Sequence, residues 1–171
     1  MEVLAVTYLV YHKPKILISH SSLDKDFCDV FVDFLISLGF SRNTIIYTSK
    51  SEFGVPSGYD IYDYLRKYLN GKILVFFMLS KNFYDSVTCL NEMGAVWVKQ
   101  IPFFSILLPE FEHKEMKGVI NLNEHTLDLC DPIRLTELVK MFCRTWGGRI
   151  DSVEWESIKN GFIDKIKKFY D

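Results

Sequence analysis

The stretch Lys72–Ser80, KILVFFMLS, constrains the fold more than any other part of the chain. It is apolar almost throughout and shows none of the polar alternation of a strand with one wet face. A short continuous apolar run of this kind is typical of a strand that is covered on both faces, as in parallel sheets packed between helices. We therefore expect Lys72–Ser80 to be a central strand of an α/β fold.

Other apolar runs and amphipathic segments alternate along the chain. Further strands are expected at Lys15–Ser19, Thr44–Thr48, Ile101–Leu108 and, as a short segment, His125–Leu129. Helices are expected from the Ser21 cap to Gly39, around Ile61–Leu69, and over Asn82–Lys99, Ile133–Trp146 and Val153–Tyr170. This order predicts a flavodoxin-like, doubly wound, five-stranded parallel sheet with helices on both faces.

The length and composition favour one compact unit. A chain of 171 residues with 49% hydrophobic residues suits one domain with a real core. We expect residues 1–14 to be a lead-in, residues 15–171 to be the domain, and the helix over 153–170 to be an extension of it. The formal net charge of −2 gives no basic surface, so nucleic acid is not an expected partner. No apolar run reaches membrane-spanning length, so we expect no membrane partner and a cytoplasmic location.

The cysteines and one tryptophan are interpreted as core residues. Cys28, Cys89, Cys130 and Cys143 are far apart and lack metal-ligand spacing, so no metal site is predicted. They are expected to be small buried hydrophobes in a reducing compartment. Trp97 stands at helical spacing, which favours core packing.

Ligands of doubly wound folds bind at the carboxyl ends of the strands. This rule points to the loops after Ser19, Thr48 and Ser80. Neither GxGxxG after a strand nor GxxxxGK[ST] is present, so the common phosphate-binding loops are absent. A phospho-receiver function is disfavoured because the first and third strands end without an acidic cluster.

One carboxylate, Glu92, lies inside the apolar segment SVTCLNEMGAVW. The residues three and four positions away in the expected helix include no Lys or Arg, so Glu92 has no local ion partner. Two interpretations follow. Glu92 either caps a loop or bonds a backbone amide, or it faces a pocket and acts chemically.

Three segments in order resemble the Toll/interleukin-1 receptor (TIR) domain family, particularly its bacterial members. They are ILISHSSLDKDF, the loop FGVPSG, and FFMLSKNFYDSVTCLNE. The last contains a version of the family pattern Ser-x-Trp-Cys-x-x-Glu, here Ser86-Val87-Thr88-Cys89-Leu90-Asn91-Glu92. The resemblance covers roughly residues 15–146.

The resemblance implies an enzyme that cleaves NAD+ between nicotinamide and ribose, with NAD+ as substrate and no cofactor. The products are nicotinamide and ADP-ribose or a cyclic ADP-ribose-type signal. A bacterial protein of this type suits anti-phage defence such as a Thoeris system, with self-association through TIR–TIR contacts and a separate sensor or effector protein. The resemblance equally allows a non-catalytic scaffold that binds other TIR domains. A weaker alternative is an enzyme related to nucleoside deoxyribosyltransferases.

The resemblance also assigns residues. Glu92 takes the catalytic position. The substrate-binding candidates are His20, Ser21, Ser22, Phe53, Gly54, Tyr59 and Thr88. Phe53, Gly54 and Tyr59 belong to or flank the loop that gates the site in the family. Each assignment has a simpler alternative. In that alternative Ser21 only caps the helix, and Phe53, Gly54 and Tyr59 belong to an ordinary surface loop.

The sequence departs from the family at two points. Thr88 stands where members often have Trp, and an aromatic residue there is thought to help fold the substrate into a cyclic product. The loop after the first strand lacks the Arg of some members. The first departure bears on the product more than on cleavage.

Overall fold

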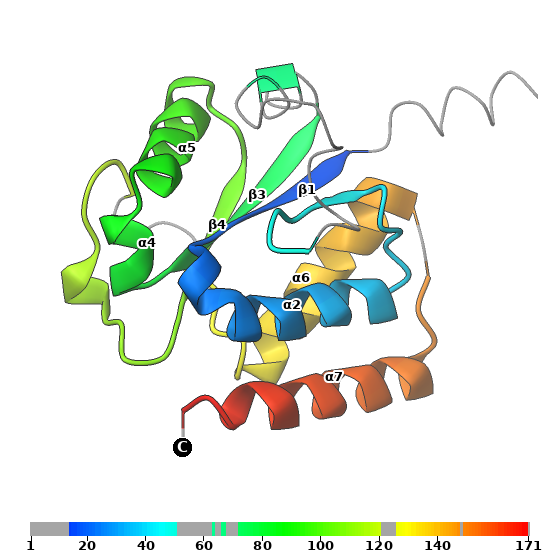
Figure 1. Cartoon of the computed structure of the whole chain (residues 1–171). Helices are drawn as coiled ribbons and strands as arrows, with labels where there is room; N and C mark the ends of the chain where they lie inside the picture. The colour runs from blue at the N-terminus through cyan, green and yellow to red at the C-terminus, as the bar shows by residue number, and fades with distance from the viewer. Residues whose placement is uncertain are drawn as a thin grey trace, which may run out of the picture.

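The structure is a computed structural model that describes residues 14–50, 63, 66–67, 72–120, 126–147 and 149–170. Its sheet is parallel and has the strand order β2-β1-β3-β4 (Figure 1). The strands are β1 (Lys15–Ser19), β2 (Ile45–Ile46), β3 (Ile73–Leu79) and β4 (Phe103–Leu107). Every residue of β3 is buried, and β3 pairs with β1 on one side and β4 on the other. The prediction of a central strand here is confirmed.

Helices cover both faces of the sheet, as predicted. They are α2 (Lys25–Ser37), α4 (Lys81–Asp85), α5 (Val87–Val98), α6 (Pro132–Phe142) and α7 (Ser152–Lys167). Short helical turns are η1 (Ser22–Asp24) and η2 (His113–Glu115), and η3 (Cys143–Gly147) is a π-helical segment. Helices α4 and α5 lie on one face, and α2, α6 and α7 lie on the other (Figure 1).

The alternation of side chains along β3 divides the core between the two faces. Leu74, Phe76 and Met78 pack with the core under α2, α6 and α7. The intervening residues of β3 pack with the core under α4 and α5. Burial of each large apolar side chain contributes about 1.5–3 kcal/mol, so β3 helps to hold both helical layers to the sheet.

The single helix expected over Asn82–Lys99 is two helices, because Ser86 interrupts it. The backbone of Ser86 is extended (φ −91°, ψ 112°), and its side chain accepts a hydrogen bond from the backbone N–H of Cys89. Serine is a favoured N-cap because its hydroxyl satisfies an N–H that the first helical turn leaves free. Ser80 caps α4 in the same way through the N–H of Phe83.

The edge strands are shorter than expected. The second strand keeps only Ile45–Ile46 of the expected Thr44–Thr48. At the expected fifth strand, Thr126 forms one parallel bridge with Ser105, and the N–H of Leu127 donates to the carbonyl of Ser105 at 2.8 Å. Within the ranges described, the sheet therefore has four strands.

Other elements differ at their ends or lie outside the description. The helix expected over Ile133–Trp146 stops at Phe142 and continues as η3. Most of the helix expected around Ile61–Leu69 lies outside the described residues. No helix within the described part of the chain is long and apolar enough to cross a membrane.

The prediction that Trp97 lies in the core is wrong, since its side chain is 56% exposed. Helix α5 packs on the sheet through Cys89, Met93 and Val96. Trp97 follows Val96 by about 100° around the helix axis, which turns it toward solvent. Burial of Cys28 and Cys89 is confirmed, whereas Cys130 and Cys143 are only half-buried.

Candidate functional site

The candidate site lies where β1 and β3 end, which we call the carboxyl edge and define by Ser19 and Ser80. Strand β2 pairs with one side of β1 and strand β3 pairs with the other side, so the order of the strands reverses at β1. Ligand sites of open parallel sheets form at such reversals, because the loops on either side separate there.

Glu92 reaches this edge from α5. The Oγ of Ser19 donates a hydrogen bond to Oε2 of Glu92 at 2.5 Å. The side chain of Glu92 is half-buried, and α5 is held against the sheet by Met93 and Val96. The helix after the third strand therefore brings its carboxylate to the end of the first strand.

The environment of Glu92 favours the protonated form. Burial raises the pKa of Glu92 to about 7, and the hydrogen bond from Ser19 acts in the opposite direction. No cation within the described ranges contributes to the pKa of this carboxyl group. Near neutral pH Glu92 therefore exists in both protonation states, which is unusual for a glutamate and typical of carboxyl groups at functional sites.

A second carboxylate, Asp24, ties together the two loops at the carboxyl edge. Its Oδ2 accepts from the Oγ of Ser80 at 2.5 Å, and its Oδ1 accepts from Nδ2 of Asn82 at 2.6 Å. The hydroxyl of Ser80 also accepts from the N–H of Phe83, so it caps α4 while it donates to Asp24. These bonds fix the turn after β1 against the start of α4.

His20 follows Ser19 and is buried. Its Nδ1 lies 3.0 Å from the carbonyl oxygen of Ile18, and its Nε2 lies 2.7 Å from the Oγ of Ser49. A carbonyl only accepts, so Nδ1 carries the proton and Nε2 accepts from Ser49. Burial lowers the pKa of His20 despite the bond to Ile18, so the imidazole is neutral near pH 7.

Of the other predicted substrate-binding residues, Ser21, Ser22 and Thr88 lie near this edge. Ser21 is buried, and its side chain caps η1 by accepting from the N–H of Leu23 at 3.4 Å, which confirms the predicted cap. Ser22 is exposed at the start of η1. Thr88 is half-buried one turn before Glu92 on α5.

Phe53, Gly54 and Tyr59, the predicted residues of the gating loop, lie outside the described residues.

Sequence reasoning missed several hydrogen-bonding partners at this edge. The sequence places Ser19 and Ser80 at strand ends, and Ser49 and Asp24 in the segments that follow two strands, without indicating these bonds. One signal was available, because Ser19 and Ser80 are the polar residues that end two apolar strands. Nothing in the local sequence shows that Ser80 and Asn82 bond to a residue more than 50 positions away.

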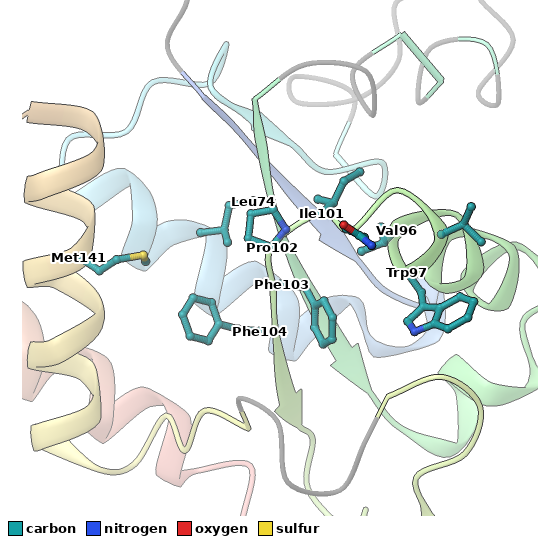
Figure 2. Close-up of a pocket in the computed structure, with 10 residues that line it drawn as sticks. Leu74, Val96, Trp97, Ile101, Pro102, Phe103, Phe104 and Met141 are labelled. Atoms are coloured by element: carbon teal, nitrogen blue, oxygen red, sulfur yellow. The ribbon is translucent and has the colours of Figure 1, made fainter.

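A hollow lies at the opposite end of the sheet, where β3 and β4 begin (Figure 2). This amino-edge hollow has a volume of about 680 Å³. Trp97 on α5 and Met141 on α6 lie on either side of it (Figure 2). Its lining consists of Leu74, Val96, Trp97, Val98, Gln100, Ile101, Pro102, Phe103, Phe104 and Met141. None of the described residues that line it has an ionisable side chain, so these residues offer no group for acid–base or nucleophilic chemistry.

Metal binding has no support in the described ranges, where no group of three or more His, Cys, Asp or Glu side chains is arranged to hold an ion.

Comparison with known proteins finds a bacterial relative. No protein-family model matches the chain. The chain is 45% identical over 153 residues to YddK of Bacillus subtilis (strain 168), which is described as an uncharacterized protein. The match covers 90% of this chain and 57% of YddK, so the chain spans little more than half the length of this relative. A match of this extent includes α4 and α5, the helices that follow the central strand.

Proposed function

We propose that this protein is a TIR-domain NAD+ nucleosidase with Glu92 as its catalytic residue. The bond broken is the one between nicotinamide and ribose, and the products are nicotinamide and ADP-ribose or a cyclic ADP-ribose-type signal. The observation that carries the proposal is a half-buried carboxylate at the carboxyl edge, held by Ser19 and without a paired cation in the described ranges.

One carboxylate is chemically sufficient for this cleavage. The reaction passes through an oxocarbenium-like state in which positive charge develops on the ribose, as in glycoside hydrolysis. The pyridinium nitrogen takes up the electron pair of the broken bond, so nicotinamide leaves as a neutral molecule. No general acid is therefore needed to protonate the leaving group. The carboxylate of Glu92 stabilises the ribosyl cation, and the partly buried position strengthens that interaction because the local dielectric is low.

The role requires ionised Glu92. Because burial raises the pKa of Glu92 to about 7, we expect turnover to increase as the pH rises through that value. The positive charge of the bound pyridinium favours the carboxylate form and lowers the pKa of Glu92 in the complex. The hydroxyl of Ser19 orients the same carboxylate before substrate binds.

We infer a TIR fold together with this activity. The strand order and the bridge between Ser105 and Thr126 support a five-stranded, flavodoxin-like TIR fold over residues 15–171. Within it, His20, Ser21, Ser22 and Thr88 contact the substrate. NAD+ is the substrate, no cofactor takes part, and the setting is a cytoplasmic anti-phage pathway with a separate sensor or effector protein.

A second candidate is a scaffold that binds other TIR domains without catalysis. One observation favours it, an exposed apolar stripe on α5. Val87, Leu90, Trp97 and Val98 are 71%, 40%, 56% and 72% exposed. Exposed apolar patches of this kind commonly mark protein interaction sites. Self-association through such a surface is also compatible with the enzyme.

The decisive experiment incubates concentrated protein with NAD+ and measures nicotinamide and ADP-ribose species by chromatography. Glu92→Gln keeps an oxygen that accepts from Ser19 but removes the charge, and we expect at least about a 100-fold loss of nicotinamide release. Glu137→Gln is the matched control, because Glu137 is an exposed helical carboxylate paired with Arg134.

Equal release by wild type and Glu92→Gln would exclude Glu92 as the catalytic residue. No release from folded wild-type protein, even at high concentration with a crowding agent, would favour the scaffold.

A further inference from the structure

Ser49 and His20 form a hydrogen-bonded pair in which the Ser49 hydroxyl and the proton-accepting nitrogen of His20 have no role in NAD+ cleavage by Glu92. The Oγ of Ser49 lies 2.7 Å from Nε2 of His20 and is the donor in this bond. Ser49 follows β2 and is half-buried, so part of the residue is exposed to solvent. His20 itself is buried and holds one orientation.

That orientation is fixed from three sides. The carbonyl of Ile18 accepts from Nδ1 and so leaves the lone pair on Nε2, which faces Ser49. The imidazole ring packs on Tyr47 with ring centroids 4.5 Å apart, and the hydroxyl of Tyr47 donates to Asp29 at 2.7 Å. A hydroxyl, a neutral imidazole and a group that orients the imidazole are the components of an activated nucleophile.

The pair and Glu92 are linked through consecutive residues at the end of β1. Ser19 bonds to Glu92, and His20 bonds to Ser49. The Cα atoms of neighbouring residues are about 3.8 Å apart. Ser19 faces α5, whereas His20 packs on Tyr47 toward α2, so Glu92 and Ser49 lie on either side of the same strand end. For both side chains to act on one ribose, its C1′ has to bind over this strand end, between them.

We propose that Ser49 is an acceptor for the ADP-ribosyl group, so that the chain modifies its own Ser49 hydroxyl. This inference rests on the proposed NAD+ cleavage. The bond between ribose C1′ and the nicotinamide nitrogen breaks, and its electron pair leaves with neutral nicotinamide. The Oγ of Ser49 forms the new bond to C1′, and its proton moves to Nε2 of His20.

The charges around His20 support that proton transfer. Proton transfer converts the neutral imidazole of His20 to an imidazolium, and burial disfavours this charged form. Asp24 and Asp29 act against burial, because their negative charges raise the pKa of His20. Lys50 lies 3.5 Å from both Asp29 and Asp33, so part of the charge of Asp29 is already compensated.

The test follows two products in the same reaction with NAD+. Nicotinamide is measured by chromatography, and the protein adduct is located by peptide mass spectrometry after hydroxylamine treatment. The O-glycosidic link to serine resists hydroxylamine, whereas an ester to Glu92 is cleaved by it. We expect a hydroxylamine-resistant adduct at Ser49 that is absent from Ser49→Ala.

Two further variants separate activation from fold. Ser41→Ala is the matched control, because Ser41 lies before β2 and bonds to Thr44 rather than to a histidine. It should keep the adduct. In His20→Gln the ratio of adduct to nicotinamide should fall at least 10-fold, since glutamine cannot take the proton. A purely structural role of His20 would lower both products together and leave the ratio unchanged.

The outcomes distinguish the two proposals. Nicotinamide release without an adduct at Ser49 would overturn the inference and leave NAD+ cleavage intact. An adduct that hydroxylamine removes and that maps to Glu92 would also overturn it. Absence of both products would overturn the two proposals together.

Discussion

The two ends of the sheet differ in chemistry. The carboxyl edge holds hydrogen-bonded polar side chains, among them Glu92, Asp24 and His20. The amino-edge hollow has a volume of about 680 Å³, and the described residues that line it are apolar except for Gln100. Partly buried polar groups cost stability unless they are bonded, so their concentration at one end favours function there. The chemistry of the side chains therefore identifies a candidate site better than the volume of a hollow does.

The largest effect on stability should come from the amino end. Leu74 is 6% exposed and packs in the core beside the hollow. Leu74→Ala should lower the free energy of unfolding by about 2–5 kcal/mol, because it removes buried apolar contact and enlarges a cavity. Urea unfolding measures this change. Nicotinamide release per folded molecule should persist, and its loss would contradict the separation of the two ends.

At the carboxyl edge, stability should depend on the ionisation of Glu92. Its pKa rises from 4.5 in the unfolded reference to about 7 in the fold, so the native state binds the extra proton between these values. The contribution of this group to native stability is therefore full below pH 4.5 and is lost as the pH rises from 4.5 to about 7. The free energy of unfolding of Glu92→Gln, relative to wild type, should then be higher at pH 8 than at pH 5 by about 1–3 kcal/mol.

Urea unfolding of wild type and variant at both pH values checks this dependence. A difference between the two proteins that does not change with pH would mean that Glu92 is solvated like a surface carboxylate.

Ser19→Ala should give a smaller effect at the same edge. The hydroxyl of Ser19 lowers the pKa of Glu92, so its removal raises that pKa further. One hydrogen bond contributes about 0.5–1.5 kcal/mol, which corresponds to a shift of about 0.5–1 pH unit. The midpoint of the pH profile of nicotinamide release should move upward by that amount. A downward shift of this midpoint would contradict a hydrogen bond that Ser19 donates to the carboxylate form of Glu92.

The smallest effect on folding should come from the exposed stripe near the hollow. Trp97→Gln should change the free energy of unfolding by less than about 0.5 kcal/mol, because Trp97 is mostly in solvent. Its effect should appear in sedimentation velocity, as weaker self-association at high concentration. A decrease in the free energy of unfolding as large as that expected for Leu74→Ala would show that Trp97 is part of the core.

The sheet could be predicted from the sequence because its signals are local. The uninterrupted apolar run of β3 determines that strand's burial, and helical spacing predicts α2 and α7 within a few residues. The break at Ser86 was missed, because the apolar pattern continues across it while the capping hydroxyl depends on backbone geometry. Trp97 was misplaced because spacing alone does not define which edge of the apolar stripe faces the sheet.

The candidate site was only partly predictable. Glu92 could be selected because an unpaired carboxylate in an apolar segment is visible in the sequence. Its bond to Ser19 joins residues 73 positions apart, so it depends on how α5 lies across the sheet. The bonds from His20 to Ser49 and from Asn82 to Asp24 are of the same long-range kind.

The separate cap at Ser86 affects how the protein tolerates insertions and deletions. In a continuous helix from Lys81, one inserted residue would rotate every later side chain by about 100° and turn Glu92 away from Ser19. With α5 starting from its own cap, a length change within α4 is absorbed before Ser86. The link between the central strand and Glu92 can therefore vary in length while the carboxylate keeps its direction.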